Sequence, residues 1–387
     1  MIVPLADRLN DVKAYYFVKK LEEIRALKAA GNDVINFGIG SPDLPPSEET
    51  IKALTETAEE EGSHGYQPYK GIPELREAIA NWYKNTYNVD INPEHEILPL
   101  MGSKEGILHV TLAFVNPGEE VLVPDPGYPT YTSLSTLLGA SVVKYDLSEE
   151  TDWYPNLEEL EKRDLSKVKL MWINYPHMPT GTPAKKEVFE ALIAFAKKHK
   201  ILLCHDNPYS LVLHQGEPMS LLSLEGAKDV AIELNSFSKS HNMAGWRIGI
   251  MLGAEEYISN ALRIKSNIDS GMFLGTQKAT IEALKLDNQW HFERNEIYRE
   301  RRDVVFEIFD YLGFEYSLKQ EGMFVWAKPK ADSEIKNIEA FVDNLLLEKH
   351  IFFTPGFIFG KNGNGYMRAS LCVPAERMKE ALLRLKA

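Results

Sequence analysis

The stretch Ser236-Phe-Ser-Lys-Ser-His-Asn-Met-Ala-Gly-Trp-Arg247-Ile-Gly249 lies between two apolar runs. Lys239 stands in it among small hydroxyl residues, and Arg247 follows eight positions later. A free lysine is a cation and a poor nucleophile, but it can form a Schiff base with an aldehyde. Small neighbours leave room for such a group, and Ser236, Ser238 and Arg247 could hold a phosphate. Most lysines are simply solvated, so this interpretation depends on the rest of the chain.

Short apolar runs alternate with amphipathic segments on both sides of this stretch. We expect strands at 97–101, 120–123, 141–145, 169–173, 201–205, 230–235 and 247–252, and helices at 73–87, 103–115, 128–138, 185–199 and 255–267. This alternation requires crossover connections, and it predicts an α/β fold with a mostly parallel seven-stranded sheet covered by helices. Ligands bind at the carboxyl ends of the strands in such sheets.

The two ends of the chain differ from this middle part. Residues 7–30 have apolar positions at helical spacing, and a short strand is expected at 34–39. After residue 285 we expect helices at 289–312, 338–349 and the C-terminus, with strands at 322–328, 351–354 and 365–371. These elements predict a smaller α+β domain built from both chain ends. The predicted division is an N-terminal segment 1–45, a large domain 46–288 and a C-terminal small domain 289–387.

The composition narrows the class of protein. The chain has 387 residues, 44% hydrophobic and 26% charged, as soluble globular proteins do. A net charge of -13 without a basic run argues against nucleic acid as a partner. No apolar run is long enough to cross a bilayer and the first residues lack a signal-peptide pattern, so we expect a cytoplasmic protein. Cys204 and Cys372 make neither a disulfide framework nor a metal cluster, and we expect both to be buried thiols.

Two segments place polar groups directly after predicted strands. Asp206 follows the strand at 201–205, where an acid is unfavourable unless it is paired; it is either a turn residue or a functional carboxylate. Gly102, Ser103 and Lys104 lie between a strand and a helix. The N–H groups at a helix start bind anions, although the same residues also suit an ordinary cap.

Two further segments offer an aromatic face and a buried cation. Tyr128, in Pro126-Gly-Tyr-Pro-Thr-Tyr131, presents a ring suited to offset stacking, unless it is simply an exposed loop tyrosine. Arg368 lies inside the strand expected at 365–371. Its planar fork matches a carboxylate in two parallel hydrogen bonds, and a structural salt bridge is the alternative.

The order and spelling of these motifs resemble the class I/II aminotransferases of fold type I, which use pyridoxal 5'-phosphate (PLP). The resemblance extends from Gly40 to Arg368 and is strongest to the aspartate and LL-diaminopimelate branch, in segments 36–46, 102–106 and 266–271. It implies a homodimer that transfers an amino group from an L-amino acid to a 2-oxo acid by ping-pong kinetics, through pyridoxamine phosphate. An acidic substrate of aspartate or diaminopimelate type, with 2-oxoglutarate as acceptor, is an option.

The resemblance also implies roles for individual positions. Lys239 holds the cofactor and moves the substrate proton, Asp206 faces the pyridine nitrogen, and Tyr209 donates to the phenolic oxygen. The implied cofactor-binding residues are Gly102, Ser103, Lys104, Tyr128, Asn174, Asp206, Tyr209, Ser236, Ser238, Lys239, Arg247 and, from the partner subunit, Tyr66. The implied substrate-binding residues are Gly40, Arg368 and Met178, and no metal is implied.

One position departs from the family pattern. Members of the family have the sequence N-P-T-G in one turn. Its asparagine donates a hydrogen bond to the phenolic oxygen of the cofactor and helps to hold the substrate carboxylate. This chain has Asn174-Tyr-Pro-His-Met-Pro-Thr-Gly181, with Met178 in the asparagine position. A thioether cannot donate a hydrogen bond. Tyr209 is then the main donor, Asn174 and His177 are candidates to compensate, and we expect intact cofactor binding with altered substrate affinity or ionisation of the bound cofactor.

The residue that recognises the substrate side chain is left open. Dicarboxylate-specific relatives often use an arginine of the partner subunit, but the matching position here is Leu262, with Arg263 beside it. Lys104 is another candidate. Two other classes of protein stay open as well: a PLP-dependent lyase such as a cysteine-conjugate β-lyase, and a PLP-binding regulator, for which the chain has no DNA-binding module.

Overall fold

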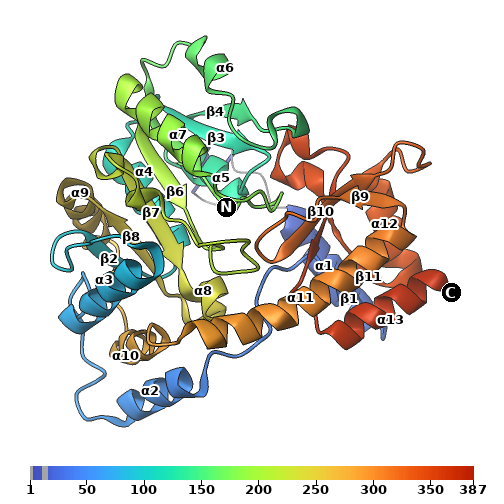
Figure 1. The fold of residues 1–387 in the computed structure, drawn as a ribbon, viewed down its shortest axis with the longest axis horizontal. Helices are drawn as coiled ribbons and strands as arrows, with labels where there is room; N and C mark the ends of the chain where they lie inside the picture. Colours follow the sequence, from blue (N-terminus) through green and yellow to red (C-terminus); the bar gives the residue numbers. More distant parts are fainter. Residues whose placement is uncertain (1–2, 11–15) are drawn as a thin grey trace.

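The computed structural model describes residues 3–10 and 16–387, most of which surround a seven-stranded sheet (Figure 1). The strands are β2 (Ile97–Leu100), β3 (Glu120–Asp125), β4 (Ser141–Asp146), β5 (Val168–Ile173), β6 (Leu202–Asp206), β7 (Ala231–Ser236) and β8 (Gly249–Gly253). Their order is β2-β8-β7-β6-β5-β3-β4, and β8 alone runs in the direction opposite to the other six. The predicted mostly parallel seven-stranded sheet is confirmed.

Helices cover both faces of this sheet. The predicted ones are α3 (Pro73–Tyr87), α4 (Ser103–Phe114), α5 (Pro129–Leu137), α7 (Lys186–His199) and α9 (Glu255–Lys265). Leu203 and Cys204 are neighbours in β6, yet Leu203 packs in the core with α3 and α7, and Cys204 packs in the core with α4, α5 and α9. Burial on both faces explains why the strands are nearly continuous apolar runs.

Some sequence predictions for this part need correction. The strand predicted at 247–252 begins only at Gly249, because Arg247 has a φ of 54°, which is incompatible with a strand. Cys204 is buried as expected, but Cys372 lies beyond the last strand and is only partly buried. The sequence reasoning did not predict α2 (Glu48–Glu59), α6 (Leu157–Glu161), α8 (Phe237–Ser240) or α10 (Leu274–Ala283).

The two chain ends meet in a second, smaller layer. β1 (Ile35–Asn36) pairs in parallel with β11 (Ile351–Phe352), so the N-terminal segment does return to the C-terminal part. A four-stranded antiparallel sheet has the order β12 (Thr354–Pro355), β13 (Met367–Ser370), β10 (Phe324–Pro329) and β9 (Phe314–Tyr316). Its helices are α1 (Tyr16–Ala29), α11 (Asn288–Tyr311), α12 (Ile338–Lys349) and α13 (Ala375–Lys386). Figure 1 shows α11 running from the side of the large sheet to the smaller layer.

The chain ends also differ from prediction in detail. The strand expected at 351–354 is split into β11 and β12. The helix expected at 7–30 is a short 3-10 turn at Asp7–Leu9 followed by α1 from Tyr16, and residues 11–15 lie outside the described residues. The division at residues 45 and 288 stays a prediction. Across 3–10 and 16–387, no helix has the length and hydrophobicity needed to cross a membrane.

Candidate active site

A cavity of about 680 Å³ gathers most of the residues singled out in the sequence. Its lining includes Gly40, Ser103, Lys104, Tyr128, Asn174, Met178, Asp206, Tyr209, Ser236, Ser238, Lys239, Arg247 and Arg368. Most of them come from the segments at the carboxyl ends of β3, β5, β6 and β7, from the start of α4 and from β13, while Gly40 follows β1 and Arg247 precedes β8. Parallel strands bring their carboxyl ends to one edge, which explains how residues so distant in sequence meet here.

Lys239 lies on α8, the single helical turn that follows β7. Ser236 caps this turn, because its hydroxyl accepts a hydrogen bond from the backbone N–H of Ser238 at 3.2 Å. Lys239 Nζ donates to the carbonyl of Gly40. Burial lowers the pKa of Lys239, and the charge of Arg368 acts in the same direction. A lowered pKa raises the fraction of neutral, nucleophilic amine.

Asp206 is the last residue of β6, and only one of its two carboxylate oxygens has a hydrogen-bond partner. Oδ2 accepts a hydrogen bond from the Tyr131 hydroxyl at 2.8 Å, and Tyr131 stacks on Trp172 with ring centroids 5.0 Å apart. Oδ1 is buried and has no hydrogen-bond partner within the described part of the chain. Burial raises the pKa of Asp206 to about 6. A buried oxygen without a partner suits a cationic N–H donor supplied by a bound molecule.

Tyr209 and Tyr128 complete the aromatic side of the cavity. Tyr209 is buried, and its ring meets that of Phe324 edge-on with centroids 5.9 Å apart. Burial raises the pKa of Tyr209, so its hydroxyl keeps its proton and can donate. The Tyr128 ring lies edge-on to Tyr131, with centroids 5.5 Å apart, and it lines the cavity as the sequence predicted.

The start of α4 lies directly against Arg247. Gly102 is the N-cap residue with a φ of 85°, and a Cβ there would come within 2.1 Å of Arg247 Nη2. The guanidinium therefore lies directly over this turn. Gly249 is equally constrained, because a Cβ on it would lie 2.6 Å from the backbone nitrogen of Ser103. A helix start beside a guanidinium offers charge-assisted donors to a phosphate.

Arg368 lies in β13 and is held from several sides. Nη2 donates to the carbonyl of Gly38 at 2.9 Å, and Nη1 donates to Met178 Sδ at 3.4 Å. Its guanidinium carbon lies 3.9 Å from the ring centroid of Phe324 and 4.7 Å from that of Phe359. These rings lie against the guanidinium and restrict its orientation, and Arg368 lines the cavity.

The two residues expected to compensate for Met178 are occupied elsewhere. Asn174 Nδ2 donates to the carbonyl of Asp206 at 2.6 Å, and Asn174 Oδ1 accepts from the backbone N–H of Met178 at 2.7 Å. His177 is buried, and its Nδ1 is hydrogen-bonded to Thr180 at 2.8 Å. Asn174 therefore ties the ends of β5 and β6 together, and His177 does not line the cavity.

Besides His177, four predicted positions lie outside the lining of this cavity. Gly102 is just behind it, as the backbone of the turn described above. Tyr66 is 93% exposed and does not reach the cavity of its own chain. Leu262 and Arg263 lie on α9, also away from the cavity of their own chain, whereas Lys104 lines it.

The sequence reasoning assigned no role to Tyr131 or to the rings around Arg368. Tyr131 reaches a carboxylate 75 positions away, so nothing local in the sequence marks that contact. A second tyrosine, three residues after Tyr128 at helical spacing, was the available signal. The contact of Phe324 depends on the pairing of β10 with β13, which the strand predictions did not specify, and Phe359 reaches Arg368 from the short 3-10 helix at Gly356–Phe359.

These groups fit one kind of cofactor. A buried amine of lowered pKa suits an aldehyde, an unpartnered buried carboxylate oxygen suits a protonated ring nitrogen, and the turn before α4 suits a phosphate. Together with the parallel sheet they define a PLP-dependent enzyme of fold type I.

Comparison with known proteins narrows the class. The family model described as aminotransferase class I and II matches residues 32–385. An LL-diaminopimelate aminotransferase of Halothermothrix orenii is 42% identical over 382 residues, which is 98% of this chain and 97% of the relative. That of Aquifex aeolicus is 39% identical, with 98% of each chain covered. The chain belongs to the aminotransferase class I and II family.

Solved structures agree on the fold. Substrate-bound BacF from Bacillus subtilis is 35% identical with a TM-score of 0.94, covering 99% of this chain and 97% of that one. A probable N-succinyldiaminopimelate aminotransferase from Thermus thermophilus is 33% identical with a TM-score of 0.88, covering 96% and 99%. The protein is thus a PLP-dependent aminotransferase, and the alternative of a lyase is not favoured.

Proposed function

We propose that this aminotransferase takes an L-amino acid of diaminopimelate or aspartate type as donor and 2-oxoglutarate as acceptor. The name shared by the relatives cited above supports this choice, since each aligns over nearly its whole length. Lys104 supports it as well, because it places a cation in the cavity lining where a distal carboxylate could bind.

The roles of the site residues are part of this proposal. When bound, the cofactor supplies an electron-withdrawing ring that stabilises negative charge at the substrate Cα. Lys239 Nζ would take the proton from that Cα as general base and deliver it, as general acid, to the carbon that was the cofactor's aldehyde carbon. Asp206 Oδ1 holds the proton on the ring nitrogen, and the Tyr209 hydroxyl donates to the phenolic oxygen. The observation that carries the proposal is the meeting of Lys239 and the unpartnered Asp206 oxygen in one cavity.

Binding and orientation fall to the remaining residues. Ser103, Ser236, Ser238, Lys104 and Arg247 would hold the phosphate together with the backbone of Gly102, and Tyr128 would stack on the ring. Arg368 turns its fork to the substrate α-carboxylate, beside the backbone of Gly40. A Cβ on Gly40 would come within 2.3 Å of the Phe324 ring, so glycine lets the chain pass close to this ring.

The active form in this proposal is a cytoplasmic homodimer in which Tyr66 binds the phosphate in the partner's cavity. Its support is the 93% exposure of Tyr66 together with exposed apolar side chains nearby in the sequence and fold, Tyr69 at 46% and Phe273 at 40%. Aromatic side chains exposed to this degree are typical of interfaces between subunits.

A donor and acceptor screen tests the substrate proposal. Purified yellow protein is assayed with diaminopimelate, aspartate and neutral amino acids against 2-oxoglutarate. We expect kcat/KM to be highest for donors with a distal carboxylate, and, with PLP kept saturating, Lys104→Met to lower it about tenfold more for those donors than for neutral ones. Neutral donors serve as the internal control. A preference for neutral donors, or release of pyruvate and ammonia without an acceptor, would contradict the proposal.

A further inference from the structure

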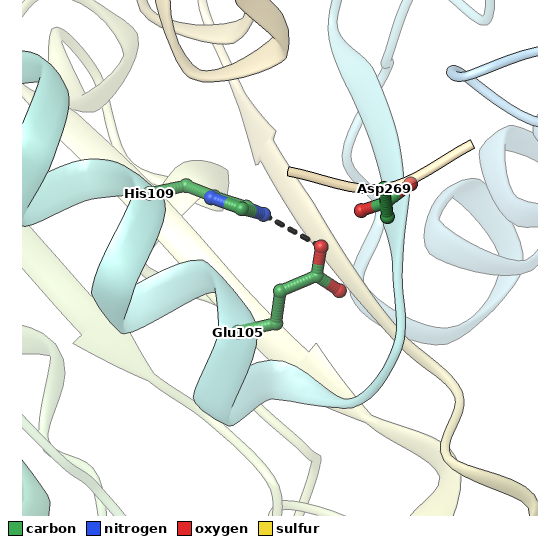
Figure 2. Close-up of side chains that lie close together, drawn as sticks. All are labelled: Glu105, His109 and Asp269. Atoms are coloured by element: carbon green, nitrogen blue, oxygen red, sulfur yellow. Dashed lines mark hydrogen bonds and ion pairs between the residues drawn. The ribbon is translucent and has the colours of Figure 1, made fainter. Parts of the chain in front are cut away.

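We call the turn at residues 101–103, where the cofactor phosphate is proposed to bind, the phosphate turn. Three side chains next to it are arranged as a metal site would be (Figure 2). Glu105 and His109 come from successive turns of α4, and Asp269 follows α9; their ligand atoms all lie within 4.8 Å of one another. Lys265, however, is 1% exposed and places Nζ 2.9 Å from Glu105 Oε1 and 2.6 Å from Asp269 Oδ2. The lysine itself supplies the positive charge between the two carboxylates, which removes the electrostatic demand for a metal ion.

Glu105 connects this cluster to the backbone of the phosphate turn. It is the third residue of α4, and its Oε2 accepts a hydrogen bond from the backbone N–H of Met101, before the N-cap. A glutamate at this helix position commonly reaches back to fix the preceding chain. Burial alone would raise the pKa of Glu105, but hydrogen bonds from His109 and Lys265 lower it to about 2. The carboxylate is therefore charged at neutral pH and is a strong acceptor.

Asp269 connects the same lysine to the segment that precedes α3. Its Oδ1 accepts from the backbone N–H of Gly271 at 3.0 Å. Gly271 has a φ of 87°, and a Cβ there would lie 2.4 Å from the carbonyl of Gln67. The backbone of the residues after α9 is thus in close contact with the loop next to Tyr66. Lys265 lies between this loop and the phosphate turn. It contacts Asp269, which binds the loop side, and Glu105, which binds the turn.

We infer that Lys265 and Glu105 are positioning residues that hold the backbone N–H groups at the start of α4 in place for the cofactor phosphate. This rests on the proposed phosphate position over Gly102. Neither side chain lines the cavity, so both act through the turn and not on the reacting atoms. Loss of either one lets the turn relax, which weakens phosphate binding and leaves the ring-binding groups intact.

Two cofactor forms separate this role from a general loss of stability. Dissociation constants are measured for PLP and for pyridoxal, which lacks the phosphate, with wild-type protein, Lys265→Met and Glu105→Ala. We expect each variant to bind PLP about tenfold more weakly, the equivalent of one charged hydrogen bond, with pyridoxal binding unchanged. Lys228→Met is the matched control: its ammonium bridges Glu96 at 2.7 Å, away from the turn, and both constants should stay as in the wild type.

Each pattern of PLP and pyridoxal binding either supports or overturns the positioning role of Lys265 and Glu105. Equal weakening of PLP and pyridoxal, or no change in either, overturns the inference. If Lys265→Met does not fold, Glu105→Ala decides alone, since it removes the bond to Met101 directly. Failure of the proposed function would look different, because the wild-type protein would then bind PLP no more tightly than pyridoxal.

Discussion

Replacement of Met178 by asparagine would restore the donor that the family pattern has and this chain lacks. Met178 is 6% exposed, lines the cavity and accepts a hydrogen bond from Arg368 Nη1 through its sulfur at 3.4 Å. An asparagine side chain offers an amide oxygen to the same guanidinium and an N–H to the phenolic oxygen of the cofactor. Both contacts are stronger than those of a thioether.

The expected size follows from one added neutral hydrogen bond, worth about 1 kcal/mol. A donor at the phenolic oxygen draws charge from it, so the proton that governs the visible absorbance of the holoenzyme is held less tightly. The pH midpoint of that absorbance should fall by about 0.7 units, since one pKa unit corresponds to about 1.4 kcal/mol. A firmer Arg368 should lower the donor KM by about fivefold. Spectrophotometric titration and steady-state kinetics measure the two effects.

Met178→Leu is the control for this experiment. Leucine keeps the volume and removes the sulfur without adding a donor, so the absorbance midpoint should stay at the wild-type value. The reasoning fails if Met178→Asn leaves both the midpoint and KM unchanged, or if Met178→Leu shifts the midpoint as much as asparagine does.

Three further changes have definite expected outcomes. Arg368→Lys keeps the positive charge but removes the two parallel N–H donors of the guanidinium. The donor KM should therefore rise about tenfold or more, with an unaltered holoenzyme spectrum. Gly102→Ala forces a Cβ into the place of the Arg247 guanidinium at a φ of 85°, and cofactor release after dilution should be about tenfold faster. Because burial raises the pKa of Asp206 from 3.8 to about 6, the cofactor-free protein should lose stability as pH rises through that interval, on the order of 2–3 kcal/mol. Asp206→Asn should flatten this slope in urea unfolding curves.

The central sheet was predictable because its strands are buried on both faces. Val121, Leu122 and Val123 are all buried, so β3 reads as an unbroken apolar run that needs no alternation to identify it. α10 was not predicted, since its residues Leu274–Ala283 are small or polar around most of the helix and give little periodic signal. The start of β8 was wrong because no local rule places an arginine in the left-handed region.

The site was predictable where a motif carries its own chemistry, as for Lys239, Asp206 and Arg368. It was not predictable where a contact depends on how distant segments meet. Asn174 looked available to the cofactor, but its amide is hydrogen-bonded to the backbone of Asp206 at the end of β6 and of Met178 in the turn after β5. Lys265 falls in the helix predicted at 255–267 and was not singled out, and only the fold shows it buried between two carboxylates.

Reduction of the holoenzyme with borohydride, followed by peptide mapping, tests the central claim most directly. The account predicts one cofactor-labelled peptide containing Lys239, and no trapped label in Lys239→Ala. Label on any other lysine, Lys104 and Lys265 included, or retention of the label in Lys239→Ala, would contradict it.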